Sequence, residues 1–395
     1  MDIKKFLPDE KTTRIAVYVI AALAVLYMAA GIYSNRRTKS LDDFKIYYYT
    51  AKAFKDGLNP YSGASINREA GFDLKTIYRY APYSIYIFRP LVEFDYDTAC
   101  AIYLWLKIIL LMGLFYIWQK FFIKEKSGMI FMIFFIAGFH SAVYIDLKVG
   151  NISIIEQFLI WTGLYFFTQK KHAAFSAFII AASMVKFWPI LILFAYLAEG
   201  GWKNLRRLAA SFAVFAFIQA VLYLLMPALY PNFINNSPIG ESGGAINPSS
   251  FMFIRDFFAG SGASGGITFI SAAVYIAWAV FCIAAAVFAV NRNKDNNILG
   301  RIYFILLTYA LIVPRMKDYS FILLLPVAYY FTIQALKSKF SMLALVLFSV
   351  NMICFFSPQL LCGYYYLMAM LVIWVFGLIV LLGDGKAAMT PGKHA

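Results

Sequence analysis

The chain alternates between long apolar runs and shorter polar segments over most of its length. A run of about 17–25 apolar residues can cross the hydrocarbon core of a bilayer as one α-helix. The pattern therefore predicts an all-α, polytopic integral membrane protein with about twelve transmembrane segments, some of them short or half-spanning. Single crossings are expected at Ile15–Tyr33, Thr98–Phe121, Gly128–Tyr144, Ile152–Phe167, Leu208–Met226, Ile267–Val290, Ile302–Val313, Tyr319–Ala335, Phe340–Phe356 and Tyr364–Leu382.

One apolar run, Ala173–Glu199, is interrupted by Lys186 and Pro189 and is flanked by basic residues at both ends. Short basic loops lie on the cytoplasmic side of a membrane, so both ends of this run are expected on the same side. We therefore favour a pair of short helices with Lys186 at the turn between them. The alternative is one long helix kinked at the proline.

Composition agrees with a membrane protein, because 62% of the residues are hydrophobic and 14% are charged, whereas soluble domains have about 45–50% and 25%. The net charge of +15 does not indicate nucleic-acid binding, because most Lys and Arg residues stand in short loops that set membrane orientation. These loops are 124–126, 169–172, 203–207, 292–301 and 337–339. With the N-terminus inside, all of them fall on the cytoplasmic side, and the long segments 34–97 and 227–266 fall outside.

The first outer segment holds the most unusual stretch, in which Asp42 and Asp43 directly precede a triple tyrosine. Ionisable residues at membrane depth mark functional sites. An aspartate can accept a proton from a hydroxyl, and Lys and Arg pair with phosphate oxygens. We therefore expect a carboxylate base beside a site for an anionic lipid head group. The candidate residues are Asp43, Lys186, Arg315, Lys317, Arg79, Tyr47, Tyr48, Tyr80, Asn151, Asn247 and Asp318.

Each candidate also has a purely structural interpretation. Asp43 could cap the helix that begins near Phe44, Lys186 could be a snorkelling lysine, and the tyrosines could be interfacial anchors. Asn247 could serve only loop structure. No His, Cys, Asp and Glu cluster has the spacing of metal ligands, so neither a metal nor a cofactor is expected. Cys354 and Cys362 flank a short loop and could pair if that loop faces an oxidising compartment.

Several short motifs, taken in order, resemble those of glycosyltransferase family 87, whose members are polytopic enzymes of the GT-C fold. The opening motif corresponds to Asp43 through Tyr48, followed by Gly57-Leu58-Asn59-Pro60-Tyr61. A Tyr-x-Tyr-Pro-Pro motif corresponds to residues 78–82, with Ala81 in place of the first proline. The Gly-Gln-x-Asn step corresponds to residues 150–153 with two changes, the Lys-x-x-Pro step is intact at residues 186–189, and an Asn-x-Ser segment followed by Arg corresponds to Asn247, Ser249 and Arg255. Asp318 stands about where family members often have a histidine.

The resemblance implies that residues 1–395 form a single integral membrane glycosyltransferase domain. Within it, 34–97 is a first outer loop with the catalytic Asp43, 227–266 is an outer loop rich in Gly, Pro and Ser, and 384–395 is a polar tail. The implied reaction transfers a hexose, possibly mannose, from a polyprenyl-phosphate donor to a lipid-linked or glycan acceptor, with inversion. Membrane lipids would be further partners, and the active site would face the exterior of the inner or plasma membrane.

Two other classes of protein are open on the residues alone. One is a secondary transporter or lipid flippase, which should show repeated halves and broken helices meeting at the bilayer midplane. The other is an O-antigen polymerase or ligase, for which a long outer loop late in the chain is expected. The long loop of this chain comes first, and its polar residues gather on one predicted face.

Overall fold

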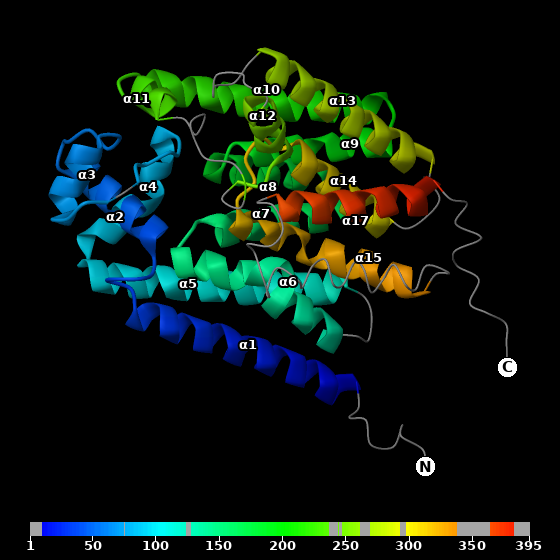
Figure 1. Ribbon diagram of the computed structural model, residues 1–395, viewed down its shortest axis with the longest axis horizontal. Helices are drawn as coiled ribbons and strands as arrows, with labels where there is room; N and C mark the ends of the chain where they lie inside the picture. The colour runs from blue at the N-terminus through cyan, green and yellow to red at the C-terminus, as the bar shows by residue number, and fades with distance from the viewer. Residues whose placement is uncertain are drawn as a thin grey trace.

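The computed structural model describes residues 10–74, 76–123, 128–236, 244, 247–260, 269–292, 298–337 and 364–382. Throughout these ranges the regular secondary structure is helical, without a strand. Most helices run roughly side by side along the long axis of the molecule (Figure 1). The prediction of an all-α, polytopic membrane protein is confirmed.

Seven helical segments of the described chain are long and apolar enough to cross a membrane. They are α1 (Glu10–Ser34), α5 (Tyr96–Ile117, continued by the π-helical turn Trp118–Phe122), α6 (Gly128–Val149), α10 (Trp202–Leu225), α13 (Phe269–Arg292), η8 with α15 (Asp318–Leu324 and Leu325–Lys337), and α17 (Tyr365–Leu382). Shorter apolar helices are α7 (Ser153–Thr168), α8 (His172–Val185), η5 with α9 (Trp188–Phe194 and Ala195–Glu199), and α14 (Ile298–Ile312). The expected span Phe340–Phe356, the pair Cys354 and Cys362, and the tail 384–395 lie outside the described residues.

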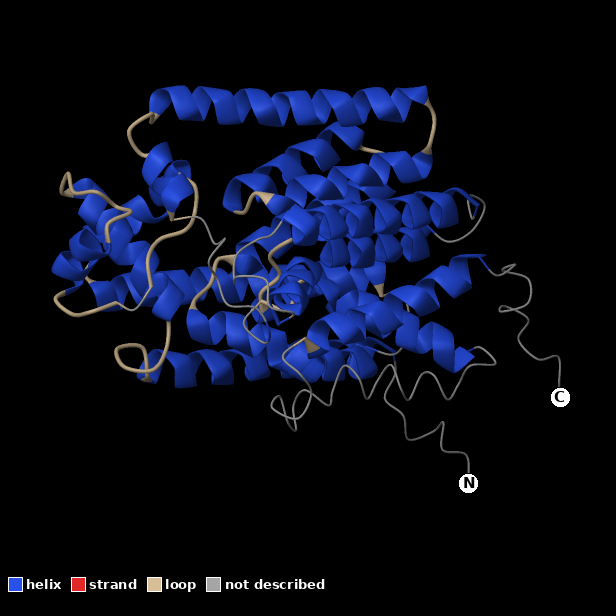
Figure 2. Cartoon of the chain, turned by 45° about the horizontal axis from the view of Figure 1, so that its top comes forward, coloured by secondary structure: helices blue, strands red, loops and turns tan. Residues whose placement is uncertain are grey.

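The spans differ in how far they are enclosed by the rest of the protein. In its most apolar window, the segment Asp318–Leu336 is 78% buried, whereas α10 is only 17% buried and α13 22%. Figure 2 shows α10 along one edge of the bundle. Large apolar side chains of these outer helices are exposed, such as Leu224 at 74% and Phe269 at 88%. Such continuous apolar exposure suits contact with lipid rather than water.

The run Ala173–Glu199 forms two antiparallel helices and not one kinked helix. The Tyr196 hydroxyl donates a hydrogen bond to the carbonyl of His172 at 2.8 Å, which places the end of the run beside its beginning. Helix α8 has 14 residues, which gives a length of about 21 Å at 1.5 Å per residue, less than the roughly 30 Å of hydrocarbon. The predicted pair is confirmed, with Lys186 at the turn where the chain reverses.

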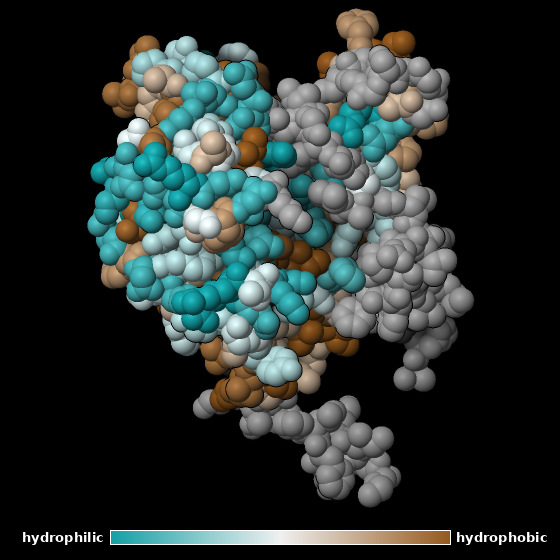
Figure 3. Space-filling view, turned by 60° about the vertical axis from the view of Figure 1, so that its left-hand side comes forward, coloured by the Kyte–Doolittle hydropathy of each residue, from teal (hydrophilic) through white to brown (hydrophobic). Residues whose placement is uncertain are grey.

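The polar end of the bundle is built by α2 (Asp42–Lys55), α3 (Gly63–Ala70), η2 (Pro82–Ser84), α4 (Ile85–Phe88) and η3 (Arg89–Glu93). In Figure 1 this group lies at the left, whereas α1 begins and α17 ends at the right. Seen from that left-hand side, the molecule presents a hydrophilic centre with hydrophobic side chains toward its rim (Figure 3). The smaller helices α11 (Tyr230–Asn235) and α12 (Ser250–Gly260) follow α10.

Helix α6 is broken in its middle, which the apolar pattern did not predict. Phe139, His140 and Ser141 have left-handed backbone angles, with φ of 48°, 55° and 57°. Left-handed residues other than glycine cost roughly 1–2 kcal/mol each, so tertiary packing must hold this turn. A Cβ atom on Gly138 would lie 2.6 Å from a methyl group of Leu325. The break therefore lets the chain pass close to the junction of η8 and α15.

Candidate active site

The beginning of α2 is held against the end of α6 by a close backbone contact. The N–H of Leu41 donates to the carbonyl of Lys148 at 2.7 Å. Gly150 has φ of +70°, and a Cβ atom there would lie 2.9 Å from the Cβ atom of Phe44. Because glycine has no side chain, the turn after α6 can adopt this left-handed angle and still touch α2. The contact brings Asn151 to the first turn of α2.

Asn151 holds the carboxylate of Asp43. Its Nδ2 donates to Asp43 Oδ2 at 2.6 Å. The orientation of the amide is fixed, because Oδ1 accepts from the backbone N–H of Ser153 at 3.1 Å and the amide nitrogen must therefore face the other way. The amide therefore anchors one oxygen of the Asp43 carboxylate.

Three tyrosines surround this contact. Tyr47 lies one turn after Asp43 on the same face of α2, and its hydroxyl donates to that of Tyr80 at 2.9 Å. Both hydroxyls also accept hydrogen bonds from the Asn151 amide nitrogen, at 3.0 and 3.1 Å. Tyr61 donates to the backbone carbonyl of Tyr80 at 2.7 Å. Tyr47 is only 2% exposed, so its ring packs inside the protein and its hydroxyl contributes to the network.

Lys186 joins the same network from the turn between α8 and η5. Its Nζ lies 2.9 Å from Glu156 Oε2 and donates to the hydroxyl of Ser153. The Ser153 hydroxyl in turn donates to Asn151 Oδ1 at 2.9 Å. Burial alone would lower the pKa of the ammonium, but the Glu156 carboxylate and other neighbours raise it above its ordinary value. A continuous chain of hydrogen bonds therefore links Lys186 to Asp43.

The segment 314–319 completes the surroundings of Asp43. The side-chain oxygen of Asn247 accepts the N–H of Met316 at 2.9 Å, and Ser249 donates to the carbonyl of Pro314 at 2.7 Å. The segment that contains Asn247 thus braces the one that carries Arg315 and Lys317. The ring centroid of Tyr319 lies 5.1 Å from Lys186 Nζ, a cation–π distance.

The carboxylate of Asp43 experiences two opposing influences. Burial raises its pKa above the ordinary value of 3.8, while the Asn151 hydrogen bond and the charges of Arg315, Lys186 and Lys317 lower it, and burial prevails. A raised pKa makes a carboxylate a stronger base near neutral pH. The influence of the Arg315 and Lys317 charges on this pKa agrees with a position of their segment near Asp43.

Some predicted site residues form hydrogen bonds to groups other than Asp43 and Asn151. Tyr48 points to another side of α2, where its hydroxyl donates to the carbonyl of Phe94 at 2.8 Å. Asp318 Oδ1 accepts the N–H of Tyr319 at 2.8 Å, and its charge acts on Asp43 only through space. Arg79 is half-buried. The capping interpretation of Asp43 is not supported, because α2 has no side-chain cap and Asp43 binds Asn151.

Two members of the network, Ser153 and Glu156, were not among the predicted site residues. Glu156 is 4% exposed and lies in the first turn of α7, inside an apolar run. An ionisable side chain at that depth is a functional candidate by default, so its position in the sequence was an available signal. Ser153 stands at the last position of the motif at residues 150–153, but its residue type alone did not mark it, because serine is common in loops and in helices.

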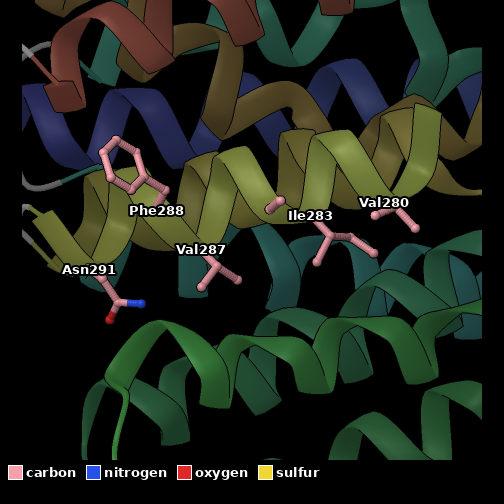
Figure 4. A pocket seen from close by; sticks show the side chains of 6 residues that line it. Val280, Ile283, Val287, Phe288 and Asn291 are labelled. Atoms are coloured by element: carbon pink, nitrogen blue, oxygen red, sulfur yellow. The ribbon is translucent and has the colours of Figure 1, made fainter. Parts of the chain in front are cut away.

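Two cavities lie away from this cluster. One of about 310 Å³ is on the other side of α2 and is lined by Arg37, Lys45, Tyr49, Phe72, Asp95, Tyr96 and Asp97. Another of about 580 Å³ runs along α13 (Figure 4), where Ile283, Val287 and neighbouring side chains form an apolar lining. That lining has no carboxylate, histidine or other group that could activate a hydroxyl. No three His, Cys, Asp or Glu side chains in the described ranges group as metal ligands.

Comparison with known proteins adds one finding. A search of curated proteins gives no match. A sequence model of glycosyltransferase family 87 matches residues 78–314, which is more than half of the chain. The match includes Tyr80, Asn151, Glu156 and Lys186 and begins after Asp43. Together with the spans described above, it shows a membrane glycosyltransferase. The chain belongs to glycosyltransferase family 87.

Proposed function

We propose that this glycosyltransferase transfers a hexose such as mannose from a polyprenyl-phosphate donor to a lipid-linked or glycan acceptor. The observation that carries the proposal is the hydrogen-bond chain from Lys186 through Ser153 and Asn151 to Asp43. A base and a phosphate-binding cation must act on neighbouring atoms in such a reaction. The hydrogen-bond chain holds a carboxylate, Asp43, and a cation, Lys186, at fixed positions relative to each other.

The reaction would be a single displacement. Asp43 takes the proton of an acceptor hydroxyl, whose oxygen forms a bond to the anomeric carbon of the donor sugar. The bond from that carbon to the phosphate oxygen breaks, and the polyprenyl phosphate leaves with its electron pair. Lys186, Arg315 and Lys317 would stabilise the leaving phosphate, since cations placed where negative charge develops lower the barrier. Attack opposite the leaving group inverts the anomeric centre.

The remaining candidate residues have supporting roles in this proposal. Tyr80 is half-buried and would border the sugar, whereas Tyr47 holds the Asn151 amide from inside the protein. Asn247 positions the cationic segment 314–317 by accepting the N–H of Met316. Arg79 and Asp318 would contact the donor or the acceptor at the edge of the site. The acceptor must approach from the polar end of the bundle.

The chain offers a matched control for the base, because Asp42 precedes Asp43 directly. The carboxylate of Asp42 is 71% exposed and pairs with Lys45 at 2.8 Å, so it points away from Asn151. We expect Asp43→Asn to abolish sugar transfer and Asp42→Asn to retain it. The measurement is incorporation of radiolabelled sugar from several polyprenyl-phosphate donors by each purified variant. Full transfer by Asp43→Asn, or equal losses in both variants, would overturn the assignment.

We further propose that the site faces the exterior of the inner or plasma membrane. The polar helices α2, α3 and α4 lie at the end opposite to the start of α1 (Figure 1). Basic residues such as Lys170 and Lys203 flank the other ends of the short helices, where the positive-inside rule expects the cytoplasm. A single cysteine at Lys52, in a variant without the native cysteines, should react with an impermeant maleimide in intact cells. Reaction only after the membrane is opened would reverse the orientation.

A further inference from the structure

A buried ion pair lies beneath the Asp43 network and takes no part in the proposed reaction. Lys107, in the middle of α5, and Asp146, near the end of α6, both have fully buried side chains, with Nζ and Oδ2 2.8 Å apart. The same Nζ donates to the carbonyls of Asp146 and Asn151, each at 2.7 Å. Lys107 thus directs its polar contacts at the two ends of one turn, residues 146–151.

A lysine at this place is costly for a membrane protein. It lies eleven residues after the start of α5, about 17 Å along the helix axis. Charges at such depth are expensive even when paired, and well-packed apolar residues are often as stable. A buried ion pair is therefore weak evidence for a stabilising role, whereas the hydrogen bond from Lys107 to the Asn151 carbonyl points to a role at the site.

The turn that Lys107 holds is the one that positions the Asp43 anchor. The Asn151 carbonyl also accepts a hydrogen bond from the hydroxyl of Tyr103 at 3.1 Å. The backbone N–H of Asn151 donates to the Asp146 carbonyl at 3.2 Å. Gly150 supplies no side chain that could fix the turn. Without Lys107, only Tyr103 would hold the carbonyl of Asn151, whose side chain must stay within 2.6 Å of Asp43.

We propose that Lys107, paired with Asp146, is a positioning residue for the reaction: it fixes the turn 146–151 so that the Asn151 amide stays on the Asp43 carboxylate. The inference rests on the proposed role of Asp43 as the base. Lys107 touches no reacting atom, because its Nζ is enclosed by Asp146 and by backbone carbonyls. Its hydrogen bond to the Asn151 carbonyl is the contact that connects it to the site.

The test separates positioning from stability by removing one charge or both. Lys107→Met alone leaves Asp146 charged and unpaired, so unfolding in detergent should occur at lower temperature. Lys107→Met with Asp146→Leu removes both charges and should restore the unfolding temperature. The double variant nevertheless leaves the Asn151 carbonyl without the hydrogen bond from the Lys107 ammonium. We expect this double variant to lose about ten- to a hundredfold in kcat/KM, the usual effect of misplacing a catalytic group.

A second readout distinguishes positioning from a general loss of structure. The acid limb of the pH–rate profile should move to higher pH in the double variant, because a displaced amide no longer favours the ionised form of Asp43. The control is Leu111→Ala, which truncates a fully buried side chain one turn further along α5. This variant should be less stable yet keep the pH profile. A double variant with wild-type kcat/KM and acid limb would overturn the positioning role, and an active Asp43→Asn would instead overturn the proposed base.

Discussion

Replacing Asn151 with leucine removes the hydrogen bond that its amide donates to Asp43, while keeping a side chain of similar volume. The bond is 2.6 Å long and its acceptor is a carboxylate. Hydrogen bonds to charged groups contribute about 1.5–3 kcal/mol, which is a ten- to roughly 150-fold change in the balance between ionised and protonated Asp43. The lost bond lowered the pKa of Asp43, so its removal must raise that pKa further.

The consequence depends on pH in a definite direction. In the proposed reaction, Asp43 must be ionised to take the proton of the acceptor hydroxyl, so it is inactive at pH values below its raised pKa. In Asn151→Leu, kcat/KM should therefore fall by about ten- to a hundredfold at acid pH and recover toward the wild-type value as the pH rises. The assay is the pH profile of kcat/KM for sugar transfer from a polyprenyl-phosphate donor.

A matched control is Asn232→Leu, because Asn232 lies on the helix α11 and its amide donates to the backbone carbonyl of Ala228. This variant should keep the wild-type profile. Two results would refute the reasoning. One is an unchanged acid limb in Asn151→Leu, and the other is an equal loss at every pH, which would mean that Asn151 matters for structure and not for the ionisation of Asp43.

Two further predictions concern the neighbours of that bond. Gly150→Ala should lower the unfolding temperature and sugar transfer more than Gly201→Ala. Both glycines have positive φ, but of the two only Gly150 would bring its new Cβ atom against another residue. Equal effects would show that the contact with α2 is unimportant. Glu156→Gln should shift the alkaline limb of kcat/KM to lower pH, since Glu156 raises the pKa of Lys186; an alkaline limb that stays in place would separate Lys186 from the reaction.

The spans could be predicted because their physics is local. Apolar length alone located α1, α5, α10, α13 and α17 to within about six residues, the largest differences being at the starts of α1 and α10. The basic ends of the run 173–199 predicted its reversal at Lys186. The break in α6 could not be predicted in this way. Left-handed angles at Phe139, His140 and Ser141 depend on packing against η8 and α15, and only Gly138 hints at it.

The site was predictable in its types of residue and less so in its contacts. Asp43, Asn151 and Lys186 stood out as polar residues beside apolar runs, and the structure brings them together. The links between them, Ser153 and Glu156, depend on side-chain directions at the start of α7, which polarity along the chain does not specify. Tyr48 shows the reverse case, since its neighbour Tyr47 reaches Asn151 and the helical turn directs Tyr48 elsewhere.

The charges around Asp43 connect donor binding to the strength of the base. Arg315, Lys186 and Lys317 all lower the pKa of Asp43, and Glu156 at 2.9 Å already neutralises part of the Lys186 charge. In the proposed reaction, a donor phosphate would neutralise these cations further, so the pKa of Asp43 should rise once the donor is bound. The acid limb of kcat, which reports the enzyme–substrate complex, should then lie at higher pH than that of kcat/KM, which reports the free enzyme. Coincident limbs would place the donor phosphate away from these cations, whereas separated limbs mean that the donor itself prepares Asp43 to accept the proton.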